Sequence, residues 1–314
     1  MNAETLSVIS IVLSVAALCA LLVQWKRVAV LRRRAKRSLY VGPDPHLRLQ
    51  KQVYDRAARL EAARRGWEPP LPIEFRSEWG EDTLLFDLFE GQESGVYIEA
   101  GALDGRENSV TWVFEALGWT GLLVEAIPER AEQCRSHRPG SRVVHAALDA
   151  ERTDGTVEFL VPSDPEQQPS AHRADRHSSE VDAGLERAGA RMSRVSVPLT
   201  TMNAALEQAG FDRVDFAIID VEGMEPEVLR GFDLARFAPR VLIIEDLGLG
   251  VRDELTPLLE PAGYRQAMWL GANRVYVRRD DQRLSERADR LAETVYSPLV
   301  RPRGHKSHAD YDLP

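Results

Sequence analysis

Residues 96–105 (VYIEAGALDG) constrain the fold more than any other part of the chain. An apolar, β-prone run ends in an acid, Glu99, and two glycines follow it, Gly101 and Gly105. Glycine is needed where the backbone takes a positive φ or passes close to a ligand, because a Cβ would collide there. The pattern therefore predicts a buried parallel strand, then a sharp turn at a ligand site, then a helix.

The acid before the glycines indicates which ligand this turn would bind. A carboxylate at Glu99 would repel a pyrophosphate, but it would attract the cationic amine or sulfonium of S-adenosylmethionine. A nicotinamide-dependent oxidoreductase would instead show Gly-x-Gly-x-x-Gly without a preceding acid, because a pyrophosphate must sit at the helix N-terminus. An ordinary glycine-rich turn after a strand is the remaining alternative for this stretch alone.

Three further apolar runs end in acids. They are residues 121–125 (GLLVE), 214–222 (VDFAIIDVE) and 240–246 (RVLIIED). The carboxyl ends of parallel strands meet at one edge of a sheet, so the acids Glu99, Glu125, Asp220 and Glu245 are expected to gather there. Glu125 lies about 20 residues after the glycines, where a carboxylate accepts hydrogen bonds from both ribose hydroxyls.

The predicted cofactor contacts come from the ends of the first three strands. The third strand is predicted at residues 142–148 (RVVHAAL), and the loop after it lies against the adenine in this architecture. Strand-like residues 264–270 and 273–279 predict a closing antiparallel hairpin. The predicted cofactor-binding residues are Glu99, Gly101, Ala102, Asp104, Gly105, Glu125, Ala126, Ala147 and Leu148.

Residues 6–25 (LSVISIVLSVAALCALLVQW) contain no charged side chain. A helix of this length spans the hydrocarbon core of a bilayer. Seven basic residues follow within positions 26–37, whereas only Glu4 is charged before the apolar run. A cleaved signal peptide would carry positive charge ahead of its apolar core. The positive-inside rule thus predicts a single-pass protein of the cell (inner) membrane with a cytoplasmic catalytic domain, held by this helix and the basic cluster.

The charge of the chain argues against nucleic acid as a partner. The formal net charge is −9, and the remainder is still more acidic once the basic cluster of residues 26–37 is set apart. A body of that charge would repel a phosphate backbone. The two cysteines, Cys19 and Cys134, lie in different contexts and do not suggest a disulfide.

Several segments resemble the FkbM-type methyltransferases, in order along residues 75–250. They are 77–82 (SEWGED), 99–105 (EAGALDG), 118–125 (GWTGLLVE), 220–231 (DVEGMEPEVLRG) and 239–241 (PRV). The chain departs from the family at Leu103, where Asn is common, and at Glu78, where Gln is common. The resemblance implies an α/β, Rossmann-like class I methyltransferase fold, a mostly parallel seven-stranded sheet with an antiparallel last strand. It also implies S-adenosyl-L-methionine as cofactor and a hydroxyl of a sugar, glycan or secondary metabolite as acceptor.

The expected layout places this domain at residues 73–280, with a polar insertion or lid at 162–194. Residues 1–5 form a short extracytoplasmic N-terminus, and 6–25 the membrane helix, which precedes the fold. Residues 26–72 form a basic juxtamembrane region with a linker helix, and 281–314 a charged C-terminal tail.

A hydroxyl acceptor must lose its proton as it attacks the methyl group, so the site needs a base. Asp220 is the first candidate, because it ends a strand beside the glycine turn. The second catalytic candidate is Glu222 or a histidine of the 162–194 insertion. Asp220, Glu222 and Glu245 would also suit a divalent metal with oxygen ligands, although we expect none. A catalytically silent, anchored domain that binds nucleosides or a partner stays open as the alternative to an enzyme.

Overall fold

The computed structural model describes residues 45–162, 172–173, 192–246, 248, 250 and 253–294. The chain divides into two units, Met1–Arg48 and Leu49–Pro314. Within the first unit only residues 45–48 are described, as the start of helix α2 (Pro45–Arg65). The fold and the site below belong to the second unit.

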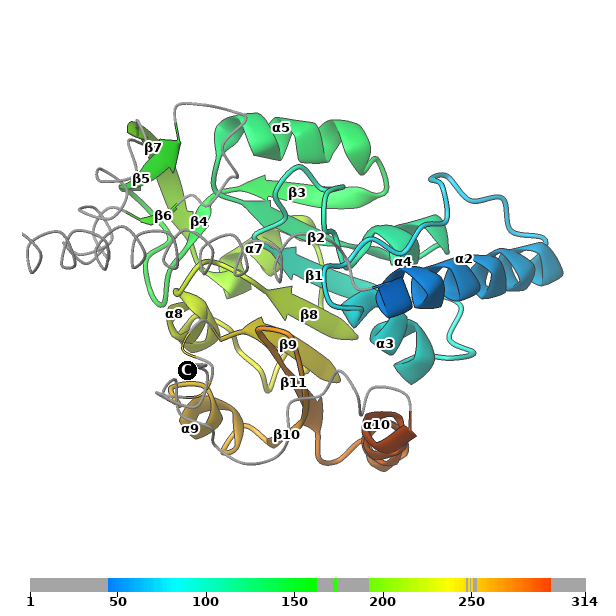
Figure 1. The fold of residues 1–314 in the computed structure, drawn as a ribbon. Coiled ribbons are helices and arrows are strands. Elements are labelled where there is room, and N and C mark those ends of the chain that lie inside the picture. Colours follow the sequence, from blue (N-terminus) through cyan, green and yellow to red (C-terminus); the bar gives the residue numbers. More distant parts are fainter. Residues whose placement is uncertain are drawn as a thin grey trace, which may run out of the picture. The chain divides into compact units, whose positions relative to one another are not determined.

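Seven strands form the central sheet in the order β10-β11-β9-β8-β1-β2-β3 (Figure 1). Strand β11 runs antiparallel to both of its neighbours, whereas β9, β8, β1, β2 and β3 are parallel. This arrangement confirms the predicted Rossmann-like, mostly parallel sheet with an antiparallel last strand. The strands are β1 (Val96–Ala100), β2 (Thr120–Glu125), β3 (Ser141–His145), β8 (Phe216–Ile219), β9 (Val241–Glu245), β10 (Tyr264–Leu270) and β11 (Asn273–Arg278).

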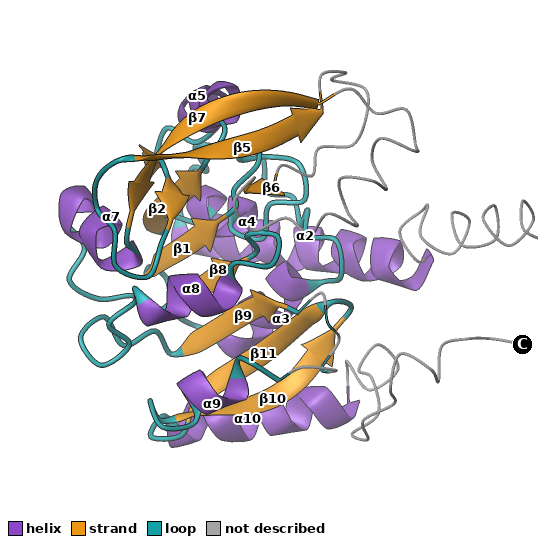
Figure 2. Ribbon diagram, turned by 90° about the vertical axis from the view of Figure 1, so that its left-hand side faces the viewer, coloured by secondary structure: helices purple, strands orange, loops and turns teal. Residues whose placement is uncertain are grey.

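Helices cover both faces of this sheet, as the two views in Figures 1 and 2 show. Alternate residues of a strand point to opposite faces, so Tyr97 of β1 joins one apolar core and Ile98 the other. The first core contains residues of α2, α3 (Glu81–Leu88), α4 (Trp112–Ala116) and α10 (Gln282–Thr294). The second contains residues of α7 (Met202–Ala209), α8 (Glu225–Arg230) and α9 (Thr256–Leu259). Burial on both faces explains why the strands read as continuous apolar runs.

A second, smaller sheet has the order β4-β7-β5-β6. Its strands are β4 (Ala147–Leu148), β5 (Thr156–Pro162), β6 (His172–Arg173) and β7 (Met192–Thr200). The predicted third strand is thereby divided, because Ala147 and Leu148 leave the central sheet and pair with Leu199 and Thr200 of β7. Ala147 packs there in a separate apolar cluster with Val197 and Leu199, which accounts for the change of sheet. Between β5 and β7, the predicted insertion lies mostly outside the described residues.

The predicted charged tail begins as an ordered helix, α10. Leu284 and Ala288 lie one turn apart on one face of α10 and are buried in the first core, where the helix contacts α3. Helical spacing of a few apolar residues is enough to hold a strongly charged segment against the domain.

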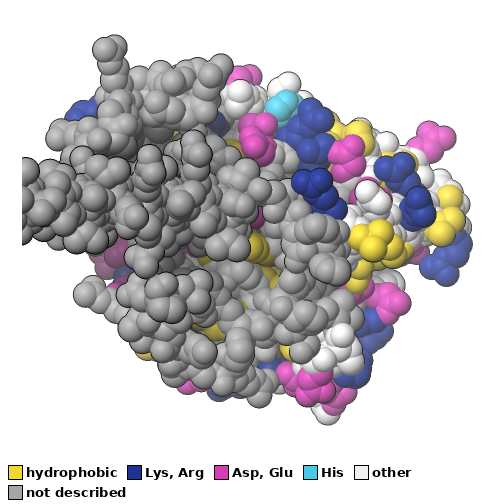
Figure 3. Space-filling model, viewed as in Figure 1, with side chains coloured by type: hydrophobic (Ala, Val, Ile, Leu, Met, Phe, Trp, Pro, Cys, Tyr) yellow, Lys and Arg dark blue, Asp and Glu magenta, His cyan; other side chains and the backbone are white. Residues whose placement is uncertain are grey.

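The described part of the surface in Figure 3 carries side chains of both charges, interspersed with a few apolar ones. The large exposed apolar residues of the described part are Leu49, Val53, Leu60 and Trp67, all on or just beyond α2. Such mixing is typical of a solvated surface. The absence of a nucleic-acid partner stays a prediction.

The predicted membrane anchor is corrected by the structure. No helix among the described residues is both long enough and apolar enough to cross a bilayer. The predicted span, residues 6–25, and the basic cluster that follows it lie outside the described residues. The assignment to the inner membrane with a cytoplasmic domain is therefore not supported and is withdrawn. It rested on length and absence of charge, which spans share with leader segments and buried helices.

Candidate active site

A cavity of about 310 Å³ opens at the carboxyl ends of β1, β2, β8 and β9. Most of the predicted site residues line it, namely Glu99, Gly101, Ala102, Glu125, Ala126, Ala147, Leu148, Asp220 and Glu222. Asp104 and Gly105 belong to the same loop but are not among the lining residues. The structure thus brings together acids from four strands, as expected for the carboxyl edge of a parallel sheet.

Gly101 places the turn after β1 directly against the end of β8. Its φ is +82°, and a Cβ at this position would lie 1.8 Å from the backbone carbonyl oxygen of Asp220. The Gly101 N–H donates to the carbonyl of Val124 at 2.9 Å. Only glycine fits this approach. The two landmarks of the sequence, the glycine turn and Asp220, are therefore in contact through their backbones.

Glu99 ends β1 with its carboxylate engaged by the protein. Its oxygens accept hydrogen bonds from Ser109 Oγ at 2.8 Å, the Val110 N–H at 2.8 Å and Thr111 Oγ1 at 2.5 Å. These contacts fix the segment that leads into α4. The sequence assigns Glu99 to the cofactor, whereas in the structure its carboxylate holds the loop that follows β1.

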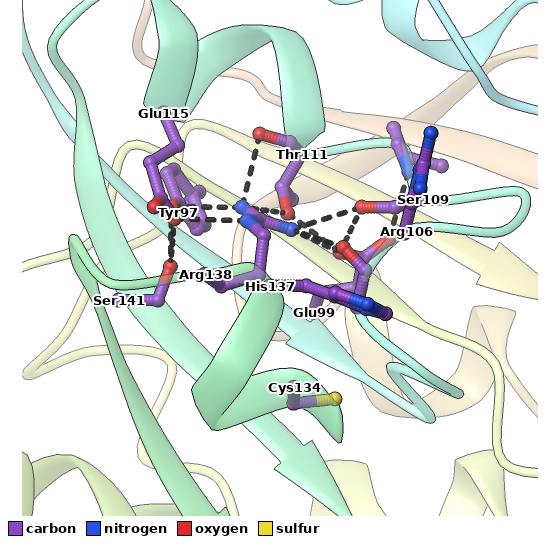
Figure 4. Close-up of polar contacts among 12 residues, drawn as sticks. Tyr97, Glu99, Arg106, Ser109, Thr111, Glu115, Cys134, His137, Arg138 and Ser141 are labelled. Atoms are coloured by element: carbon purple, nitrogen blue, oxygen red, sulfur yellow. Dashed lines mark hydrogen bonds and ion pairs between the residues drawn. The ribbon is translucent and has the colours of Figure 1, made fainter. Parts of the chain in front are cut away.

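A buried arginine, Arg138, also holds this loop in place (Figure 4). Its Nη1 donates to the Gly105 carbonyl at 3.1 Å and to Ser109 Oγ at 3.0 Å, and it lies 3.6 Å from Glu99 Oε2. Its Nε donates to Glu115 Oε2 at 2.8 Å. A further fork of bonds reaches Tyr97 Oη at 2.9 Å and Thr111 Oγ1 at 3.0 Å. Because a buried charge is tolerated only when it is paired, this network ties α5 (Pro128–His137) to the loop.

Sequence reasoning did not single out Arg138. It follows a short, mostly polar helix and precedes Pro139-Gly140, so the sequence around it is typical of an ordinary helix end. Its burial depends on Glu99 and Glu115, which lie on other elements, and no local pattern records that.

Asp104 and Gly105 shape the turn. Asp104 Oδ1 accepts from the N–H groups of Arg106 at 2.8 Å and Glu107 at 2.7 Å, which closes the turn on itself. Gly105 has a φ of +76°, and a Cβ there would lie 3.0 Å from Arg138 Cγ. Both residues therefore contribute to the site through the backbone conformation they permit.

Leu103, where the family commonly has Asn, has a φ of 54°. A side chain with a Cβ is strained in this left-handed region, and Asn tolerates it better than Leu. The Leu103→Asn variant is therefore expected to have a free energy of unfolding higher by roughly 1 kcal/mol. Urea unfolding measures this, with Leu234→Asn, a half-buried leucine outside the site, as the control that should lose stability. An equal loss in both variants would contradict the strain at Leu103.

Glu125 ends β2 and lines the cavity. It is buried, and its carboxylate accepts from the N–H groups of Leu103 and Ile127, both at 2.9 Å. Burial raises the pKa of Glu125, while these backbone bonds oppose the shift. A carboxylate oxygen has more than one acceptor site, so Glu125 keeps acceptor capacity for a ligand hydroxyl.

The walls near Glu125 are apolar. Ala126, Ala147 and Leu148 line this end of the cavity, together with Phe159 from β5. The sequence had not indicated Phe159, because it lies on a strand of the second sheet and reaches the cavity only through the pairing of β5 with β7.

Three acids meet where β8 and β9 end. Asp220, Glu225 and Glu245 each bring one carboxylate oxygen within 4.8 Å of the others. Glu225 Oε1 accepts from the N–H groups of Val221 at 3.0 Å and Gly223 at 3.1 Å, so it fixes the turn after Asp220. The metal site considered from the sequence combined Glu222 with Asp220 and Glu245. In the structure the turn brings Glu225, not Glu222, next to those two acids, and Glu222 lines the cavity.

The pKa of each member of this group is raised, first by loss of water around the carboxyls. The charges of Glu222, Glu78 and Glu99 add to the rise at Asp220, and the charge of Asp220 adds to the rise at Glu225 and Glu245. The pKa of Asp220 rises to about 6, that of Glu225 to about 7 and that of Glu245 to about 10. Glu245 Oε2 is buried and receives no hydrogen bond. A proton held by Glu245 would allow it to donate to Asp220, and such a bond lowers the pKa of Asp220 while it raises that of Glu245.

The raised pKa of Glu245 makes stability depend on pH. The folded state keeps a proton that the unfolded chain loses near pH 4.5, so this group's contribution to stability falls as the pH rises from 4.5 toward about 10. Glu245→Gln keeps a donor and removes the titration. The difference in melting temperature, variant minus parent, should therefore grow between pH 5 and pH 9. A difference that is constant over this range would show that Glu245 titrates normally.

Comparison with known proteins gives a family. The family model for the methyltransferase FkbM domain matches residues 99–265, from the end of β1 into β10. No curated protein matches the chain.

Solved structures of methyltransferases are similar at low sequence identity. An O-methyltransferase from Bacillus cereus in complex with SAH shares 13% identity, over 78% of this chain and 96% of that one, with a TM-score of 0.35. A TehB-like SAM-dependent methyltransferase from Corynebacterium glutamicum shares 12%, over 73% and 97%, also with a TM-score of 0.35. A methyltransferase from Geobacter sulfurreducens shares 12%, over 79% and 97%, again with a TM-score of 0.35. At this identity such a likeness concerns the fold alone.

Proposed function

We propose that this chain, which belongs to the FkbM methyltransferase domain family, transfers the methyl group of S-adenosylmethionine to a hydroxyl of a sugar, glycan or secondary metabolite. The observation that carries the proposal is the backbone contact between Gly101 and Asp220. This contact places Asp220, the candidate base, immediately beside the turn that would hold the cofactor. The base and the turn therefore lie at the same cavity.

The residues at the β1–β2 end of the cavity suit this cofactor. Glu125 would accept hydrogen bonds from the ribose hydroxyls. The small and apolar side chains of Ala126, Leu148 and Phe159 offer a wall for the adenine. A volume of about 310 Å³ lies at the lower end of the range for small-molecule sites, roughly 300–1,000 Å³.

The β8–β9 end of the cavity suits the acceptor. S-adenosylmethionine supplies a methyl carbon that is activated by its bond to a sulfonium. The acceptor oxygen bonds this carbon as the carbon–sulfur bond breaks, in line, so alignment is the main task of the site. The hydroxyl proton passes to a carboxylate oxygen of Asp220, and the products are a methyl ether and S-adenosylhomocysteine.

The surroundings of Asp220 match this role. With a pKa of about 6 it is ionised at neutral pH, yet it is more basic than an ordinary aspartate. Because the pKa of Glu245 is raised to about 10, Glu245 keeps its proton at neutral pH and would orient Asp220 by donating to it. Glu225 fixes the turn that follows. Glu222 lines the same cavity and is the second candidate for the base.

Ligand binding tests the proposal. We expect calorimetric titration to show that S-adenosylmethionine and S-adenosylhomocysteine bind and that NAD does not. Binding of NAD alone would favour an oxidoreductase. Binding of the nucleosides without methyl transfer to any hydroxyl compound in cell extract would favour the silent binding domain.

Replacing Glu125 tests the ribose contact. Glu125→Ala is expected to weaken S-adenosylmethionine binding by roughly 1–3 kcal/mol, because hydroxyls buried in the complex lose their acceptor. Glu129→Ala, at an exposed position in the first turn of α5, is the matched control and should bind as the parent does. Unchanged affinity in a folded Glu125→Ala protein would remove the ribose site from this position.

A further inference from the structure

The carboxyl groups of the cavity fall into two sets with different surroundings. At the cofactor end, Glu99 and Glu125 are hydrogen-bonded by hydroxyl or backbone N–H groups. At the other end, Asp220 and Glu245 have each other as partners, and Glu78 and Glu222 line the cavity with them. The charge at this second end is therefore not matched by the protein in the same way.

The lysine and arginine side chains of the described residues lie away from this second end of the cavity. Among the described lining residues the only lysine or arginine is Arg130, and its charge acts on Glu125 at the cofactor end. The charges that act most strongly on Asp220 are those of Glu222, Glu78 and Glu99, and those acting on Glu245 are likewise carboxyls. Lys51 acts on Glu78 but is not a lining residue, and its ammonium donates to the Ser77 carbonyl.

We propose that the methyl acceptor carries a protonated amine close to the hydroxyl that is methylated, and that Glu222 and Glu78 bind this ammonium group. An amino sugar has this chemistry. The inference rests on the proposed methyl transfer and adds the class of acceptor. The cofactor brings a single net positive charge, which is fewer than the carboxylates of Asp220, Glu222 and Glu78 at this end of the cavity.

The same charges disfavour the main competing acceptors. A phosphate or carboxylate on the acceptor would face Asp220, Glu222 and Glu78 without a described cation to pair with. Like charges brought together at a binding site are repelled and serve to exclude wrong ligands. The hydroxyls of a neutral sugar would donate hydrogen bonds to these carboxylates, but the sugar would form no charge pair with them, so it should bind more weakly than the amine.

Three sugars of similar size separate these cases. Binding of glucosamine, N-acetylglucosamine and glucose 6-phosphate is measured by NMR titration of the full chain, saturated with S-adenosylhomocysteine. Glucosamine is expected to bind at least about tenfold more tightly than N-acetylglucosamine, and glucose 6-phosphate most weakly, as close charge pairs at a binding site predict. In Glu222→Gln and Glu78→Gln this preference should shrink, whereas in the control Glu151→Gln, an exposed site outside the cavity, it should persist.

The outcomes for this inference and for the proposed function are distinct. If S-adenosylhomocysteine does not bind, the proposed function fails. If it binds, and glucosamine has no advantage over the other two sugars or none of the three binds, the inference on the acceptor is overturned while the methyltransferase proposal stands. An amine preference that survives both glutamine variants would likewise overturn the assignment to Glu222 and Glu78.

Discussion

Asp220→Asn is expected to lower the rate of methyl transfer by about 10²–10⁴, the usual contribution of a positioned general base. Binding of S-adenosylmethionine should change little, because Asp220 meets the glycine turn through its backbone carbonyl, which the substitution keeps. Asparagine also preserves the shape of the side chain and keeps one acceptor oxygen. Turnover and affinity, measured on the same preparation, give the two quantities.

The pH profile adds a check that a structural role would not alter. The base must be ionised, so kcat of the parent should rise with pH through about 6, the pKa of Asp220, and should be fully developed above it. The groups facing Asp220 are Glu245, Glu222, Glu78 and Glu99. The charges of Glu222, Glu78 and Glu99 keep its pKa high, whereas the hydrogen bond from Glu245 lowers it. Residual activity of Asp220→Asn should lack this limb. Full activity in the variant would move the base to Glu222.

Arg138→Met is expected to cost about 3–5 kcal/mol of unfolding free energy, because it leaves Glu99 and Glu115 buried without their counter-charge. Denaturant unfolding measures the loss. Arg265→Met is a suitable control, since Arg265 pairs with a half-exposed Asp289 at 2.9 Å and such a pair contributes at most about 1 kcal/mol.

Arg138→Lys distinguishes charge from geometry if the methionine variant does not fold. Lysine keeps the charge but lacks the planar fork that reaches Gly105, Ser109 and Thr111 together. The lysine variant should be folded and should bind S-adenosylmethionine more weakly than the parent, since the loop is held less firmly. A methionine variant within 1 kcal/mol of the parent would contradict the role of Arg138.

The sheet could be predicted from the sequence because the pattern that indicates each strand lies within that strand's own residues. A short apolar run ending in Glu99, Glu125 or Asp220 indicates a buried parallel strand and the edge at which it stops. The same local logic found Gly101, whose positive φ and close contact require glycine.

The sequence did not predict the roles of residues that act through contacts with another helix or strand. Glu225 was visible in the sequence, but its approach to Asp220 and Glu245 depends on the conformation of the intervening turn. Phe159 reaches the cavity only because β5 pairs with β7. Arg138 is buried by acids that are remote in the sequence. Periodicity and spacing describe one element at a time, so they do not show which residues of different elements come into contact.

A crystal structure of the chain with S-adenosylhomocysteine tests the central claim most directly. The account predicts the ribose hydroxyls within hydrogen-bonding distance of Glu125, the adenine against Leu148 and Phe159, and the sulfur on the side of Asp220. A nucleoside bound outside this cavity, or bound in reverse with its adenine beside Asp220, would contradict it.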